Sequence, residues 1–171
     1  MPTSAEISRA VTSAACDCLD ECVTKIRHCV DQLSDQQIWW RPADELNSIG
    51  NLMLHLSGNL RQWIVAGLTG AADTRTRPAE FSERGPIPKA QLLEQLQSTV
   101  DDAKRVLSGM PGTEILQPRE IQGFHVTGVG AIFDSIPHFK GHTQETICLT
   151  RMQLGSAYQF HWQPTTPEQG A

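Results

Sequence analysis

Residues 3–33 contain neither glycine nor proline, the two residue types that most strongly disfavour a helix interior. Within this stretch, apolar and cysteine side chains recur at steps of three and four, which places them along one face of a helix. The positions with this spacing are Ile7, Val11, Ala14, Cys18, Cys22, Ile26, Cys29 and Leu33. The stretch therefore predicts one long first helix with a single apolar face.

The same spacing predicts three further helices, over residues 49–68, 88–108 and 129–154. Ser48 or Asn47 is suited to cap the second helix, and Pro88 lies near the first turn of the third. Pro137 either kinks the fourth helix or marks a short turn before it. With no convincing alternating strand and no internal repeat, the pattern predicts an all-α protein, an antiparallel four-helix bundle. The long connections leave its handedness open.

Three connections separate the predicted helices. Residues 33–50 read as a loop in which Trp39 and Trp40 cover openings of the core. Residues 74–90 contain three prolines and alternating charges, which indicates an exposed connection. Residues 109–128 predict a short extended piece or an ordered loop. We expect a single domain over residues 1–171, with its core in about 5–155 and a C-terminal tail over 156–171.

Composition excludes several classes of protein. Of 171 residues, 39% are hydrophobic and 19% are charged, as in soluble globular chains. The formal net charge is -5 and no cluster of lysine and arginine is present, so a nucleic-acid partner is not expected. No run approaches the roughly 18 apolar residues that a membrane span requires, and the first residues do not resemble a signal peptide. We therefore expect a cytoplasmic protein with no membrane partner.

The five cysteines are predicted to be free thiols. Cys16, Cys18, Cys22 and Cys29 all fall within the first predicted helix rather than in loops that disulfides would join. Cys18 and Cys22, four residues apart, are candidates for a soft metal or for oxidant sensing. The favoured interpretation is that these side chains, and Cys148 with them, act as small apolar residues.

Histidines on two predicted helices form the candidate metal site. His138 and His142 are spaced i and i+4, so both imidazoles can approach one ion. On a helical wheel they fall within a band of roughly 80° that faces a neighbouring helix. That band contains His138, His142, Glu145, Leu149 and Met152.

A metal site of this kind needs a third ligand, and His55 is the one histidine of the second predicted helix. Its wheel position is at the boundary of the buried face, where histidines more often bind solvent or make a hydrogen bond. The remaining histidines, His28, His125 and His161, have no comparable partners. The residue pattern alone supports a metal site and a pair of ordinary histidines about equally.

Two blocks of the chain, "LSDQQIWWRPADELNSIGNLMLHLSGNLRQWI" and "IPHFKGHTQETICLTRMQLG", resemble the DinB superfamily of DinB/YfiT-like metalloenzymes. The likeness extends over about residues 5–155. It implies a four-helix bundle of up-down-down-up topology, usually dimeric, with a divalent zinc or nickel ion at one end. By this resemblance the metal ligands are His55, His138 and His142, and Trp39 or Trp40 lies near the pocket.

Characterised relatives of this kind include mycothiol-dependent maleylpyruvate isomerase, bacillithiol S-transferases and the helical domain of sulfoxide synthases. The resemblance therefore implies a metal-dependent enzyme that activates a thiol or water, similar to a thiol S-transferase. A metal-dependent hydrolase, a non-catalytic metal-binding protein and a metal-free interaction protein remain alternatives. The implied partners are a small-molecule substrate, such as a low-molecular-weight thiol, and a second copy of the chain.

The expected substrate position is among Trp39, Trp40 and the 109–128 loop. There an activated thiol or water would attack an electrophilic substrate. Glu145 can orient an imidazole or carry a proton, although a surface or interhelical carboxylate is the favoured interpretation. Asp134, four residues before His138, is similarly placed at the uncertain start of the helix. Neither carboxylate is included among the predicted ligands.

Overall fold

The computed structural model describes residues 3–163 of the chain. Four long helical segments form the body, and short elements join them. In chain order the elements are α1 (Ser4–Asp31), α2 (Asp35–Ile38), α3 (Ile49–Leu60), the π-helix η1 (Arg61–Ala66), α4 (Gly67–Thr69), α5 (Arg77–Ser82), α6 (Lys89–Gly109), η2 (Glu114–Leu116), β1 (Pro118–Ile121), β2 (Phe124–Thr127), α7 (Gly128–Leu154) and η3 (Gly155–Ala157).

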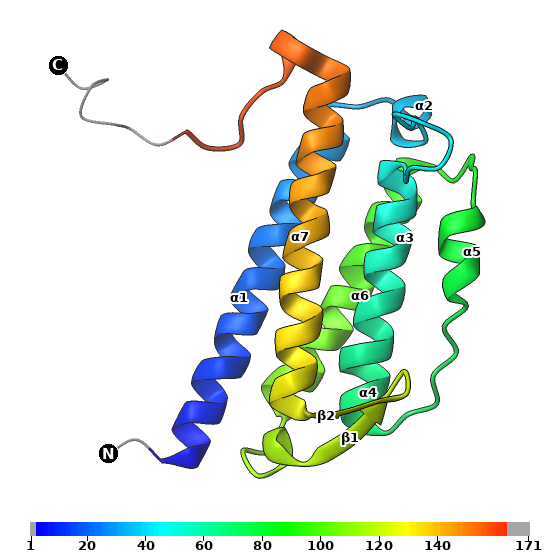
Figure 1. Ribbon diagram of the computed structural model, residues 1–171. Coiled ribbons are helices and arrows are strands. Elements are labelled where there is room, and N and C mark those ends of the chain that lie inside the picture. Colours follow the sequence, from blue (N-terminus) through cyan, green and yellow to red (C-terminus); the bar gives the residue numbers. More distant parts are fainter. Residues whose placement is uncertain (1–2, 164–171) are drawn as a thin grey trace, which may run out of the picture.

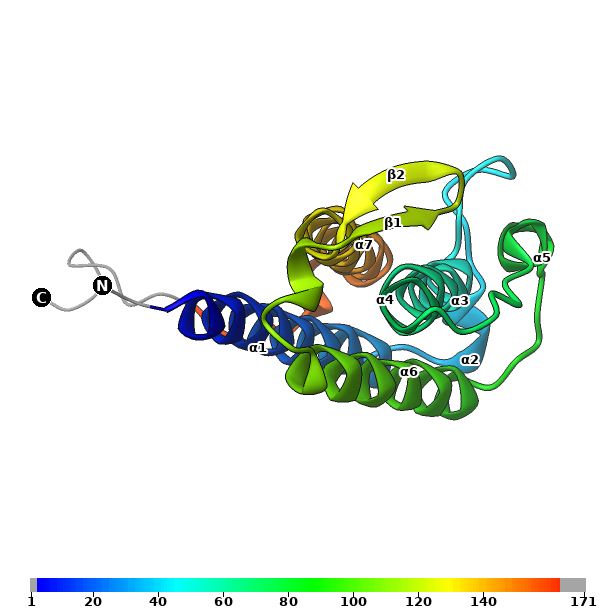
Figure 2. The ribbon, with the colours of Figure 1, turned by 90° about the horizontal axis from the view of Figure 1, so that it is seen from below.

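The long helices follow the up-down-down-up order (Figure 1). Helices α1 and α7 run in one direction. Helix α6 and the continuous segment formed by α3, η1 and α4 run in the other. Two successive helices that run the same way cannot be joined by a short turn, so residues 70–88 must return along the bundle. This crossover carries α5 on the outside of α3 (Figure 2). The all-α, four-helix prediction is confirmed.

Capping residues set the starts of three of these segments. The Thr3 hydroxyl accepts a hydrogen bond from the Glu6 amide at the start of α1. Ser48, rather than Asn47, caps α3 in the same way. Thr127 caps α7, which continues through Pro137 as one helix. The sequence therefore located the helix starts to within a residue or two.

The buried face of α7 differs from the predicted one. Met152, expected in the seam, is 59% exposed, while His138 and His142 lie at its edge. Three threonines, Thr143, Thr146 and Thr150, occupy the core face, and each hydroxyl donates to the carbonyl four residues earlier. A hydroxyl satisfied within its own helix can be buried at little cost, so apolar spacing alone misplaces this face.

The second predicted helix contains a π-helical stretch. The backbone passes from α3 into η1 and then into the short α4, which ends at Gly70 with a left-handed φ of 75°. One extra residue per turn rotates the side chains that follow, and such stretches are frequent at functional sites. In this protein, Gln62 and Trp63 of the π-helix are buried.

Two of the predicted connections are more ordered than expected. Residues 33–50 contain α2, after which Trp39 packs on Gly50 and Gly85 and donates its indole N–H to the Ile87 carbonyl at 3.0 Å. Trp40 is exposed, so the expectation that both tryptophans cover the core is wrong for this residue. The 74–90 connection contains α5, whose Glu80 is buried. It is therefore not an exposed loop along its whole length.

The 109–128 connection forms an antiparallel hairpin, as one of its two predicted forms allowed. Strands β1 and β2 pair with Ile121 opposite Phe124. Gln122 and Gly123 make the turn, and their φ angles of 56° and 80° are both positive. That pattern matches the two-residue turns preferred in hairpins. The hairpin lies beside α7 and α4 at one end of the bundle (Figure 2).

The cysteines are free thiols, as predicted. Cys16, Cys22 and Cys29 are buried, and burial raises the pKa of the Cys22 thiol above its ordinary value. A thiol held protonated is a poor nucleophile and a poor metal ligand, which supports the apolar role. Cys148 is exposed, so that role does not extend to it.

Within residues 3–163, no helix is both long and apolar enough to cross a membrane. The part of the predicted tail beyond residue 163 lies outside the described residues.

Truncation of Phe139, a fully buried ring of α7, tests the packing of the core. We expect Phe139→Ala to lower the free energy of unfolding by about 3–5 kcal/mol, because it removes buried contacts and leaves a cavity. The matched control is Phe160→Ala, at an exposed ring of the C-terminal segment, with an expected loss under about 1 kcal/mol. Urea unfolding measures both, and equal losses would contradict this packing.

Candidate metal centre

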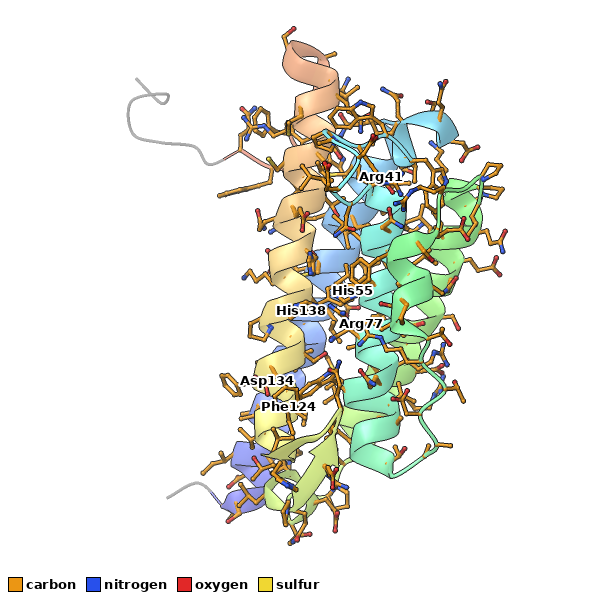
Figure 3. The ribbon with its side chains drawn as sticks, turned by 45° about the vertical axis from the view of Figure 1, so that its right-hand side comes forward. Arg41, His55, Arg77, Phe124, Asp134 and His138 are labelled. Atoms are coloured by element: carbon orange, nitrogen blue, oxygen red, sulfur yellow. The ribbon has the colours of Figure 1, made fainter. Side chains whose placement is uncertain are left out.

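Three histidines from two helices face one another. His55 of α3 and His138 of α7 bring their Nε2 atoms to 2.9 Å, and their side chains point toward each other (Figure 3). One ring nitrogen from each of His55, His138 and His142 lies within 4.8 Å of the other two. The interplanar angles are 81°, 90° and 89°, so each ring presents an edge to a common space. The predicted cluster is therefore brought together by the fold.

The cluster lies near the middle of α7, between α3 and α7 (Figure 3). The resemblance implied a position at one end of the bundle, and the structure differs in this respect. His55 is also only 4% exposed, whereas its wheel position predicted a boundary residue. The cause is α5, whose Phe81 ring lies 4.8 Å from the His55 ring between centroids. A helical wheel cannot anticipate cover from a separate segment.

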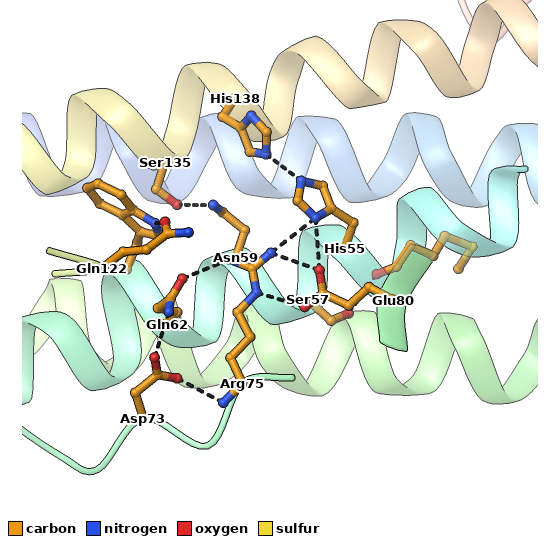
Figure 4. A network of polar contacts seen from close by, with 12 residues as sticks. His55, Ser57, Asn59, Gln62, Asp73, Arg75, Glu80, Gln122, Ser135 and His138 are labelled. Carbon is orange, nitrogen blue, oxygen red and sulfur yellow. Dashed lines mark hydrogen bonds and ion pairs between the residues drawn. The ribbon is translucent and has the colours of Figure 1, made fainter. Parts of the chain in front are cut away.

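A buried carboxylate fixes the orientation of His55. The Glu80 Oε2 atom lies 2.9 Å from His55 Nδ1, and Arg75 donates from Nε and Nη2 to the two Glu80 oxygens at 2.7 and 2.8 Å (Figure 4). Burial alone would raise the pKa of Glu80, but the hydrogen bonds from Arg75 and His55 hold it below its ordinary value. The carboxylate is therefore ionised and accepts hydrogen bonds only.

The ionised carboxylate determines which nitrogen of His55 carries the proton. Because Glu80 can only accept, His55 donates its Nδ1–H, and Arg75 Nη2, 3.0 Å from Nδ1, donates to the same carboxylate. The Nε2 lone pair of His55 is then directed at the other two histidines. A carboxylate behind a histidine is the usual arrangement around metal-binding imidazoles.

A second carboxylate lies behind His142. The Glu145 Oε2 atom is 2.7 Å from His142 Nδ1, which leaves Nε2 free to face the cluster. This contact is the one expected of a carboxylate that orients an imidazole, whereas the favoured interpretation was a surface or interhelical carboxylate. Burial, and then the neighbouring His142 and His55, lower the pKa of His138 to about 4. His138 is therefore neutral at pH 7, as a metal ligand must be.

These features suit a divalent ion. Two nitrogen ligands about 2.0–2.1 Å from one ion lie about 2.9 Å apart at an octahedral angle and about 3.3 Å apart at a tetrahedral angle, and the 2.9 Å between His55 and His138 is close to both. Three neutral imidazoles could hold a metal ion and leave a position for another ligand. Among residues 3–163, no other group of three histidine, cysteine or acidic side chains comes together in this way.

A cavity of about 460 Å³ opens beside the cluster. It is bounded by α3 and η1, the crossover, the hairpin and α7. Its lining residues are His55, Asn59, Trp63, Arg75, Arg77, Gln122, Phe124, His125, Val126, Asp134 and His138. The hairpin of the 109–128 connection lines it, as expected, and so does Asp134.

The tryptophan in the cavity is Trp63, not Trp39 or Trp40. The expectation for those two residues is wrong because Trp39 is held against Gly50 and Gly85, away from the cavity, and Trp40 faces outward. Trp63 lies in the π-helix η1 and donates its indole N–H to Gln122 Oε1 at 3.2 Å. This hydrogen bond joins η1 to the hairpin.

Sequence reasoning did not identify Arg75, Glu80 or His125 as residues of the site. All three come from connections rather than from predicted long helices. The one local signal was Pro78 ahead of Glu80 and Phe81, since proline is favoured in the first turn of a helix. It predicts a short helix but not which residue of it is buried.

Comparisons with known proteins agree with this fold. A family described as "Protein of unknown function (DUF1572)" matches residues 6–164. A crystal structure of a conserved protein from Enterococcus faecalis superposes with a TM-score of 0.73 at 17% identity, covering 84% of this chain and 97% of that one. The crystal structure of a DinB-like protein from Bacillus cereus superposes with a TM-score of 0.60 at 13% identity, covering 77% of this chain and 85% of that one. No curated protein matches. The DinB-like fold implied by the sequence is confirmed.

The ion pair behind His55 can be tested with two neighbouring arginines. Arg75 is 4% exposed in its side chain, and its loss leaves the negative charge of the buried Glu80 carboxylate uncompensated, with only the His55 hydrogen bond remaining. We expect Arg75→Ala to lower the unfolding free energy of the metal-free protein by about 3–5 kcal/mol at pH 7. Arg77→Ala, which removes an exposed side chain stacked on Phe81, should cost about 1 kcal/mol or less. Similar values for both variants in urea unfolding would contradict the assignment.

Proposed function

The chain belongs to the DUF1572 family, and we propose that it is a metal-dependent DinB-like enzyme with one divalent ion on His55, His138 and His142. Zinc or nickel is the proposed ion, because neutral imidazoles suit both. The observation that carries the proposal is the meeting of three imidazole nitrogens within 4.8 Å, with two of the three histidines, His55 and His138, lining a cavity. A purely structural site would normally be closed by a fourth protein ligand.

The proposed reaction begins with activation of a thiol or a water. An ion with an open position lowers the pKa of a thiol or water bound there. Glu80 and Glu145 contact the Nδ1 atoms of His55 and His142, which would leave both Nε2 atoms for the ion. The Asp134 carboxylate lines the same cavity and can accept the released proton. Trp63 and Phe124 offer apolar surface to an electrophilic substrate.

A thiol S-transferase-like reaction is the first candidate and hydrolysis the second, since both start from the same arrangement. The proposed partner is a small molecule, which the cavity volume of about 460 Å³ suits. A low-molecular-weight thiol is the first substrate class to examine.

Metal content is the first test, on protein purified without an affinity tag. We expect about one divalent ion per chain by elemental analysis. Alanine at His55, His138 or His142 should abolish stoichiometric binding, because two imidazoles hold an ion weakly. The control is His125→Ala, which lines the same cavity outside the cluster. No metal in the intact protein, or equal loss in the control, would reject the site.

Activity is the second test. The metal-loaded protein is assayed with bacillithiol, mycothiol, glutathione and coenzyme A, each with a generic electrophile, and with ester and amide substrates. We expect turnover that disappears on chelation and returns when the ion is restored. Inactivity with every thiol and turnover of an ester or amide would favour a hydrolase. A lower melting temperature after chelation, with no turnover in any assay, would indicate a structural ion.

We also propose that the protein forms a homodimer. Ile7 of α1 and Phe133 of α7, the latter 64% exposed, border an apolar groove of about 600 Å³ between these helices. A two-fold contact would pair this groove with its own copy, as in most homodimers. Light scattering should give twice the chain mass, and Phe133→Asp should give a folded monomer. A monomeric wild-type protein would refute the dimer.

A further inference from the structure

We propose that the cavity beside the histidine cluster binds the carboxylate of its small-molecule substrate through Arg77, with the Gln122 amide as a second donor. This inference rests on the proposed function, because it names the substrate class of the same site. Arg77 lies on α5 near the cluster (Figure 3), and Gln122 lies at the tip of the hairpin. The two residues approach the cavity from separate elements.

The two arginines of the cavity differ in what they already bind. Arg75 uses Nε and Nη2 for Glu80 and Nη1 for Gln62, at 2.7 to 2.8 Å (Figure 4). Its positive charge is compensated by a buried carboxylate. Arg77 forms no ion pair within residues 3–163, although it lines the same cavity. Arg77 is therefore the guanidinium whose donors are available to a ligand.

Arg77 is nevertheless held in place. Its Cζ atom lies 4.8 Å above the centroid of the Phe81 ring, and that ring lies 4.8 Å from His55. A cation–π contact of this kind restricts the guanidinium without using its N–H groups. The same aromatic ring thus connects the arginine to one of the proposed metal ligands. A substrate that bridges them would bind with its charged end at Arg77 and its reacting end at the cluster.

Gln122 presents a donor for a similar reason. Its Oε1 atom accepts the Trp63 indole N–H at 3.2 Å, so its Nε2 group is left as a free donor. The residue has a left-handed φ of 56°, which is unusual for a residue other than glycine. The turn and the indole hydrogen bond fix this amide at the wall of the cavity.

The charge balance favours a carboxylate over a phosphate dianion. Asp134 lines the cavity from α7 and contributes a negative charge. One available guanidinium compensates one negative charge, and its planar pair of N–H groups matches the two oxygens of a carboxylate. A phosphate dianion would bring a second negative charge close to Asp134. Among the described lining residues, no second unpaired cation is present to compensate that charge. A thiol that also carries a carboxylate can place its sulfur at the histidine cluster and its carboxylate at Arg77.

The test uses cobalt(II)-loaded protein and small thiols. Thiolate-to-cobalt absorption gives the Kd of mercaptoacetate, 3-mercaptopropionate and 4-mercaptobutyrate, each compared with the neutral mercapto-alcohol of the same chain length. We expect at least one acid to bind about tenfold more tightly than its alcohol. Arg77→Gln should remove this preference and leave both the cobalt spectrum and the affinity for the alcohols unchanged.

The matched control is Arg105→Gln, which makes the same charge change at an exposed ion pair on α6. It should retain the preference. Equal affinities for acids and alcohols in the wild-type protein would overturn the proposal. So would a preference that persists in Arg77→Gln, because the carboxylate would then bind the cobalt ion itself.

Failure of the metal site is distinguishable from failure of the carboxylate site. If the protein takes up no cobalt, the proposed function fails before any thiol is added. The carboxylate site is then judged on metal-free protein by NMR. Titration with 3-mercaptopropionate, but not with 3-mercapto-1-propanol, should shift the Arg77 Nε–H and the Gln122 side-chain amide signals. Equal shifts with both compounds, or none, would overturn it.

Discussion

The hydrogen bond between Glu80 and His55 is the interaction on which the site depends. It selects the imidazole tautomer whose Nε2 lone pair faces His138 and His142. A buried carboxylate next to a histidine is expensive to desolvate, and Arg75 offsets this cost with two short hydrogen bonds. Buried ion pairs contribute little net stability on average. Their presence behind one histidine of the cluster therefore argues for a functional rather than a structural cause.

The topology explains where this ion pair comes from. Because α3 and α6 run in the same direction, the chain must return along the bundle between them (Figure 1). The returning segment covers His55, supplies Arg75 and Glu80, and places Arg77 at the cavity. The hairpin between α6 and α7 forms the opposite wall. The helices thus bring the histidines together, while the two long connections build everything around them.

The sequence predicted the parts of the fold that follow from local rules. The absence of glycine and proline in α1, the Ser48 cap and the i, i+4 spacing of His138 and His142 each identify a feature without reference to distant residues. The convergence with His55 came from the resemblance to a family as much as from the pattern. The bundle order also depended on that resemblance.

The sequence failed where burial depends on a distant segment. His55 looked like a boundary residue because a wheel does not include α5, and Glu80 looked exposed because it lies among prolines and charges. The resemblance implied Trp39 or Trp40 near the pocket, but Trp39 closes the core against two glycines, as the loop pattern had predicted for it. Buried threonines on α7 hid its true core face. The errors at His55 and Glu80 share one cause, since local periodicity does not report cover from a distant segment.

X-ray absorption spectroscopy of the metal-loaded protein tests the central claim most directly. The claim is that three imidazoles, from His55, His138 and His142, bind one divalent ion that keeps an exchangeable position. We predict scattering from about three imidazole rings at roughly 2.0–2.1 Å together with at least one light ligand. Addition of a small thiol should replace that light ligand with sulfur at about 2.3 Å. Fewer than three imidazoles, or a closed shell that no thiol can enter, would contradict the account.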